Sequence, residues 1–186
     1  SAQDAWRRRI EARPIEMLGR RCRELLAPPR RAVAALVGAS PDDIGFVTNA
    51  TEGVNAVLRS IPIEPGDVLL TTSHVYNAVR QAMRYVARER GAVYKEIDLP
   101  APLSHDVIVE SIDMAMAENP VRLLVIDHVS SPTAIVFPVK EIIARARERG
   151  VDVLVDGAHA PGMLPVDLEQ LRPSWYAANL HKWVCA

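Results

Sequence analysis

The sequence predicts an α/β protein built on a mostly parallel sheet. Short apolar runs alternate with longer amphipathic segments from residue 68 to residue 155, and this alternation is typical of strand–helix–strand units. The chain has 186 residues, of which 49% are hydrophobic, so it is long enough to bury one core and not obviously two. We therefore expect one layered domain over residues 41–186, preceded by a helical segment over residues 1–40.

The N-terminal segment is predicted to be helical but interrupted. Within Trp6–Val37, Pro14 and the pair Pro28-Pro29 each lack a backbone N–H donor and clash with the preceding turn. We expect these prolines to divide the segment into two or three helical pieces.

Four short apolar runs are the predicted strands. They are Val68–Thr71, Ala92–Ile97, Val121–Ile126 and Val151–Val155. The longer amphipathic stretches between them indicate that the strands are joined by helices and run in parallel.

Three of the intervening segments carry clear helix signals. Tyr76–Arg90 repeats apolar residues on one face and ends at Gly91, and Val139–Arg149 does the same and ends at Gly150. Between them, Ser104 is the predicted N-cap of a further helix. We expect these helices to pack on the sheet.

Polar residues follow the predicted strands, where ligands bind in open parallel sheets. Any one of them alone is more often a helix cap or a hydrogen-bonded filler, but six such positions at one edge of a sheet indicate a site. In chain order they are Asn49-Ala50-Thr51, His74, Asp127-His128, Asp156, His159 and His181-Lys182.

The overall composition favours a small-molecule ligand. The 23 acidic and 22 basic residues nearly cancel, so no net field indicates nucleic acid or an acidic membrane surface as partner. The cysteines, Cys22 and Cys185, give neither a disulfide framework nor a metal knuckle, and no segment approaches the roughly 20 apolar residues of a membrane span. We expect a soluble, cytoplasmic protein.

Several common chemistries lack their motifs. The sequence contains no Gly-x-x-x-x-Gly-Lys-Ser/Thr loop, no Gly-x-Gly-x-x-Gly turn and no Gly-x-Ser-x-Gly elbow. A metal-dependent enzyme remains an alternative, although the candidate ligands lack a diagnostic spacing. Those ligands are His74, Asp127, His128, Asp156 and His159.

Longer segments resemble a known family. Val153–Gly162, with Asp-Gly-Ala-His-Ala-Pro-Gly, and Asn179–Trp183, with Asn-Leu-His-Lys-Trp, are similar to the class V aminotransferase superfamily of fold-type I pyridoxal 5′-phosphate (PLP) enzymes, in particular its isopenicillin N epimerase-like branch. Phe46–Asn55 resembles the phosphate loop of that family, and His128–Thr133 resembles its substrate-side loop. The resemblance implies a three-layer αβα sandwich, the large PLP-binding domain of such an enzyme. By the same resemblance, we expect this domain to be incomplete in the sequence and a small C-terminal domain to lie outside it.

The resemblance also implies roles for individual residues. Lys182 would hold the cofactor as a Schiff base, and Asp156 would keep the pyridine nitrogen protonated. Thr51 would offer its hydroxyl to the phosphate at the start of a predicted helix over residues 52–60. The backbone N–H groups of Ala50, Thr51 and Glu52 would present the positive end of the helix dipole to the same phosphate.

The remaining implied ligands surround the ring. Asn179 and His181 would complete the phosphate site, and His159 would donate to the phenolic oxygen. His74 would stack on the ring face as the third catalytic residue beside the lysine and the aspartate, with Tyr76 as a competing candidate for the stack.

Ser131 and Thr133 are candidate substrate contacts, and for them, as for Tyr76, ordinary loop packing is an equal alternative. Ala134 and Ala178 stand where the resemblance implies glycine.

The implied function is deprotonation at Cα of an amino acid or peptide-like amine, by a protein that is a homodimer when complete. Epimerisation, loss of a β-sulfur group and transamination can all follow that step, and no residue in the sequence chooses among them. A truncated or non-catalytic module of the same fold is the alternative from another class.

Overall fold

The computed structural model describes residues 1–186, which form two compact units, Ser1–Gly45 and Phe46–Ala186. The first unit is helical and contains α1 (Ala2–Ala12), the π-helix η1 (Ile15–Arg20), α2 (Cys22–Val37) and the 3₁₀ turn η2 (Pro41–Asp43). None of the helices combines the length and the apolar character that crossing a membrane requires.

The prolines of the first unit act differently from one another. A helix boundary lies at Pro14, as predicted, because α1 ends at Ala12 and η1 starts after the proline. The break predicted at Pro28-Pro29 was wrong, since α2 continues through both prolines. The fixed φ of proline is compatible with a helix, and Ala34 and Val37 beyond the pair are buried, so packing of the last turns maintains the helix.

The second unit is built on a parallel sheet of five strands. In chain order these are β1 (Val68–Thr72), β2 (Val93–Ile97), β3 (Val121–Asp127), β4 (Asp152–Gly157) and β5 (Trp175–Ala178). Their spatial order is β2-β1-β3-β4-β5, and every pairing is parallel. The four predicted strands are confirmed, whereas β5 was not predicted.

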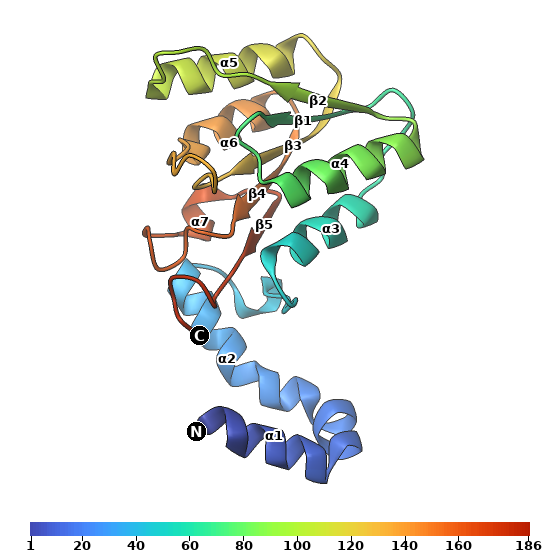
Figure 1. Cartoon of the computed structure of the whole chain (residues 1–186), viewed down its shortest axis with the longest axis vertical. Coiled ribbons are helices and arrows are strands. Elements are labelled where there is room, and N and C mark those ends of the chain that lie inside the picture. Colours follow the sequence, from blue (N-terminus) through green and yellow to red (C-terminus); the bar gives the residue numbers. More distant parts are fainter. The chain divides into compact units, whose positions relative to one another are not determined.

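Helices cover both faces of this sheet (Figure 1). On one face lie α3 (Ala50–Ser60) and α4 (Asn77–Arg90), and on the other lie α5 (His105–Ala117) and α6 (Val139–Glu148), while the short α7 (Leu168–Leu171) precedes β5. The three-layer αβα architecture and the predicted helices are therefore confirmed.

Each face has its own apolar core. Under α3 and α4, Val54 and Met83 pack with Leu69, Leu123 and Leu154 of the strands. Burial of apolar side chains at about 25 cal/mol per Å² is the main stabilising contribution of such layers. Because all five strands are parallel, their carboxyl ends meet at one edge, and the strand order reverses between β1 and β3, which is where open sheets of this kind bind ligands.

Two glycines near that edge allow close approach of other segments. A Cβ placed on Gly157, at the end of β4, would collide with the phenol ring of Tyr176 on the neighbouring β5. Gly162, with φ near +88°, would meet the backbone of Trp183 at 2.8 Å if it carried a Cβ. The first contact packs β4 against β5, and the second packs the loop after β4 against the loop after β5.

Gly157→Ala is expected to destabilise the protein by about 1–3 kcal/mol, because the new methyl group must displace the Tyr176 ring. The measurement is urea-induced unfolding of the purified variant. Gly45→Ala is the matched control, since nothing lies within 4 Å of the added Cβ there. Equal midpoints for Gly157→Ala and wild type would contradict the close contact.

Candidate active site

Asp156 lies at the carboxyl end of β4 and is nearly inaccessible to solvent, with 4% of its surface exposed. The backbone N–H of Ala158 donates a hydrogen bond to its Oδ1 at 3.0 Å. Burial raises the pKa of the Asp156 carboxyl, and the Ala158 bond and the positive charge of Lys182 oppose that rise. The site therefore disfavours an isolated negative charge and favours a cation close to this carboxyl.

Asp127 is a second buried carboxyl beside Asp156. The two residues are register partners on β3 and β4, so their side chains point to the same face of the sheet, the face covered by α3 and α4. Oδ2 of Asp127 has no hydrogen-bond partner. Burial, assisted by the charge of Asp156 and opposed by that of Arg80, raises the pKa of Asp127 to about 8. Asp127 thus holds its proton at neutral pH.

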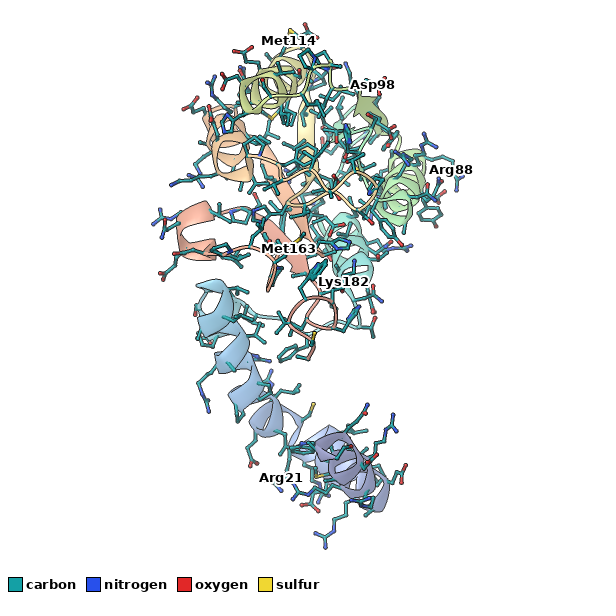
Figure 2. All side chains as sticks on the ribbon, turned by 60° about the vertical axis from the view of Figure 1, so that its left-hand side comes forward. Arg21, Arg88, Asp98, Met114, Met163 and Lys182 are labelled. Carbon is teal, nitrogen blue, oxygen red and sulfur yellow. The ribbon has the colours of Figure 1, made fainter.

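Lys182 reaches the same edge from the loop that follows β5 (Figure 2). Its Nζ lies 2.9 Å from Nε2 of His159, three residues after Asp156. The indole N–H of Trp183 donates to the other ring nitrogen of His159, Nδ1, at 3.3 Å. Burial lowers the pKa of His159, and the positive charge of Lys182 lowers it further, so the neutral imidazole is favoured. The lysine therefore contacts His159 and lies close enough to Asp156 for its charge to act on that carboxyl.

The start of α3 provides donors at the same edge. Asn49 caps the helix by accepting the Glu52 N–H at 2.9 Å, and the Ala50 N–H donates to Oδ1 of Asn179 at 2.8 Å. This differs from the expectation that Ala50 and Glu52 would both present free N–H groups. The N–H and the hydroxyl of Thr51 have no intramolecular acceptor, and neither does the Asn179 amide NH₂. Those three donors remain for an anion.

His74 lies just beyond β1, half-buried, and contacts the loop that follows β3. Its Nδ1 lies 3.0 Å from Oγ1 of Thr133, and its ring meets Phe137 edge-on with centroids 6.0 Å apart. Three other candidates, Tyr76, Ser131 and His181, are exposed and form no side-chain hydrogen bonds. The structure thus brings His74 and Thr133 together and leaves those three without a partner in the site.

A partly buried pair on the opposite face of the sheet was not predicted. Nδ1 of His128 lies 2.8 Å from the hydroxyl of Tyr176, and the two rings are perpendicular. Burial lowers the pKa of His128, and burial together with the charge of Asp156 raises that of Tyr176, so both are neutral. Gly157 was the available signal, because a glycine inside a strand marks the close approach of another group.

The candidate metal ligands do not assemble. No group of three or more His, Cys, Asp or Glu side chains is placed to hold a metal ion. His74 and His128 contact Thr133 and Tyr176 instead.

A lysine, a buried aspartate and free anion donors thus lie at the carboxyl edge of the α/β sheet, a combination typical of enzymes that bind a phosphorylated cofactor. The model of the class V aminotransferase family matches residues 11–186. The chain belongs to this family.

Relatives with different reactions match over nearly all of the chain. It is 35% identical to the isopenicillin N epimerase of Streptomyces clavuligerus over 97% of this chain and 46% of that protein, and 38% identical to that of Amycolatopsis lactamdurans with the same coverage. It is also 38% identical to putative L-cysteine desulfhydrase 1 of rice (Oryza sativa subsp. japonica), over 98% of this chain and 41% of that protein. The chain spans about half the length of the curated relatives it matches.

Solved structures show the same fold. A cystine C–S lyase, C-DES, in complex with cysteine persulfide superimposes with a TM-score of 0.77 at 29% identity, covering 87% of this chain and 43% of that one. A mutant of C-DES with glycine covalently linked to its PLP cofactor gives 0.76 at 28% identity and the same coverage. The cysteine desulfurase CsdA of Escherichia coli gives 0.74 at 26% identity, over 82% and 39%.

Asp127→Asn is expected to remove a pH dependence of stability. The unfolded Asp127 carboxyl ionises near pH 3.8 and the folded one near pH 8, so between these values the folded state holds a proton that the unfolded state has released. The free energy of unfolding of the wild type should therefore fall as pH rises, by up to about 1.4 kcal/mol per pH unit from this group.

Urea unfolding at pH 5, 6, 7 and 8 measures the effect, and the difference between the variant and the wild type should grow with pH. Asp113→Asn is the control, and its effect on stability should stay constant over this pH range. The hydrogen bond from Arg149 lowers the pKa of Asp113, so its stabilising contribution is present above pH 4 and is lost as pH falls. Parallel curves for wild type and Asp127→Asn would show that the carboxyl is not held neutral.

Proposed function

We propose that the protein is a PLP-dependent enzyme that removes the Cα proton of an amino acid or peptide-like amine. The observation that carries the proposal is that the Lys182 amine, 2.9 Å from His159, lies close enough to the buried Asp156 for its charge to act on that carboxyl. One amine and one buried acid at a single sheet edge are what this cofactor requires.

The donor set fits the cofactor. Asp156 is buried, accepts one backbone N–H and has no ion-pair partner within contact distance, so a cationic ring nitrogen would satisfy its free oxygen. Asp127 beside it holds its proton and so adds no second negative charge. When bound, PLP supplies an aldehyde carbon that an amine can attack and a ring that accepts electron density from the substrate Cα.

Thr51 and Asn179 would hold the phosphate. The hydroxyl and N–H of Thr51 are free at the N-terminus of an eleven-residue helix, where the helix dipole favours an anion. The carbonyl oxygen of Asn179 accepts the Ala50 N–H, so the NH₂ group of the same amide is left as a free donor. His181, exposed beside Lys182, would add a further donor.

His159 would orient Lys182 for chemistry. Nε2 of His159 lies 2.9 Å from the lysine nitrogen, and Trp183 contacts the other ring nitrogen, Nδ1. Lys182 would then take the proton from the substrate Cα, as a base fixed in position by its neighbour. The ordered pair contributes orientation that a free surface lysine would lack.

Epimerisation is the reaction that this arrangement favours. In the strand order β1-β3-β4-β5, His74 follows β1 and Lys182 follows β5, so the two proton-transferring groups flank the edge that carries Asp127 and Asp156. Removal of a proton by one group and its return by the other, on the opposite side, inverts Cα.

A C–S lyase is the second candidate, supported by the 38% identity to a putative L-cysteine desulfhydrase. That reaction needs only one base and a sulfur leaving group. In either case we propose that the complete protein is a homodimer that acts on a small amino-acid-like substrate.

Lys182→Ala should abolish cofactor attachment. Adding PLP to the purified wild-type protein should produce a visible absorption band that borohydride removes, and peptide mass spectrometry should then find the reduced adduct on Lys182. The remaining lysines, Lys95 and Lys140, are internal controls, and Lys140→Ala should keep the band. An adduct on either of them, or a band that persists in Lys182→Ala, would refute the assignment.

The products should separate the two candidate reactions. An epimerase would exchange the Cα proton with deuterium from D₂O and form the opposite enantiomer, whereas a lyase would release sulfide and pyruvate from L-cysteine. For an epimerase, His74→Gln should slow inversion by about 100-fold or more while Cα exchange continues, because Lys182 still removes the proton. Sulfide release without inversion would favour the lyase.

A further inference from the structure

A chain of hydrogen bonds connects His74 to the backbone of the loop that follows β3. The N–H of Ile135 donates to Oγ of Ser130 at 3.0 Å, Oγ of Ser130 lies 2.7 Å from Oγ1 of Thr133, and Oγ1 of Thr133 lies 3.0 Å from Nδ1 of His74. The chain thus begins at a group that can only donate and ends at an imidazole.

Burial of Ser130 determines the direction of this chain. Ser130 is 2% exposed, and its hydroxyl already accepts the Ile135 N–H. Its own proton has one available acceptor, Oγ1 of Thr133. The reverse direction would leave a buried donor unsatisfied, which is strongly disfavoured. The Thr133 hydroxyl therefore keeps its own proton free, and Nδ1 of His74, 3.0 Å away, is the acceptor that the chain offers it.

The loop that carries the chain is itself fixed. Ser130 and Ile135 form a backbone hydrogen bond at 3.0 Å, and the Ala134 N–H donates to the Ser130 carbonyl at 2.9 Å. Ala134 closes this turn in the left-handed region, with φ near +53°. Phe137 then places its ring edge-on to His74. The hydroxyl chain and the aromatic contact together fix the orientation of the His74 ring.

We propose that Ser130 and Thr133 are positioning residues that fix the tautomer of His74. Nδ1 accepts from Thr133, so neutral His74 carries its proton on Nε2, and Nε2 makes no hydrogen bond within the chain. A histidine held this way presents an N–H donor to the site in a fixed direction. Thr133, which the sequence suggested as a substrate contact, instead acts through His74.

The functional consequence rests on the proposed function. As the group that returns a proton to Cα, His74 must present that proton from the nitrogen that faces the substrate, and the Ser130–Thr133 pair ensures it. The tautomer itself is a property of the protein without cofactor, and it can be measured whether or not PLP binds.

The direct test is ¹⁵N NMR of histidine-labelled protein without cofactor, at a pH where His74 is neutral. The His74 signals are assigned by their loss in His74→Gln. We expect wild type to show His74 with the proton on Nε2 in at least about tenfold excess. Thr133→Val, which keeps the shape and removes the hydroxyl, should reduce that excess several-fold, and Thr133→Ser should restore it. Ser130→Ala should act in the same direction as Thr133→Val.

An unchanged His74 tautomer in Thr133→Val, or a wild-type proton on Nδ1, would overturn the proposal. A kinetic measurement gives a second readout on the PLP-loaded protein: Thr133→Val should lower kcat about tenfold or more with little change in KM, and Thr133→Ser should recover it. A rise in KM alone would identify Thr133 as a substrate contact and reject the positioning role. Failure of PLP to attach to wild type would refute the proposed function and leave the NMR result valid.

Discussion

The burial of Asp156 is the constraint on which the candidate site depends. A carboxylate in a dry, apolar layer is disfavoured unless it is hydrogen-bonded and close to positive charge. Only one backbone N–H, from Ala158, reaches it, and the charge of Lys182 acts from the loop after β5. The end of β4 is therefore a place where a cationic, hydrogen-bonding ligand would be stabilised.

The neighbouring carboxyl, Asp127, strengthens the preference of this site for a cationic ligand. Asp127 and Asp156 are forced together by the register of two parallel strands, and two buried like charges at adjacent positions oppose each other. Asp127 takes up a proton, which leaves Asp156 as the acid available to a cation. One sheet pairing thus makes the ionisation of each carboxyl depend on its neighbour.

The loops on either side of these acids are fixed by contacts between polar side chains. On one side, His159 holds Lys182 and Trp183 in place. On the other side, Thr133 and Phe137 hold His74. Both histidines are contacted at Nδ1, His159 by Trp183 and His74 by Thr133. This is the usual means by which proteins set the direction in which an imidazole acts.

The sequence by itself determined the α/β class, four of the five strands and the edge at which the chemistry would gather. Apolar periodicity and strand-end polar residues are local signals, so Asp156 and His74 could be selected without coordinates, and the resemblance of Asn179–Trp183 to a family motif selected Lys182. The tertiary structure decided what depends on distant contacts. Asp127 pairs with Asp156 across two strands, and the Tyr176 ring lies against Gly157. The Ala50 N–H donates to Asn179, and α2 continues through its two prolines. These features depend on register and packing between segments far apart in the chain, which local patterns do not encode.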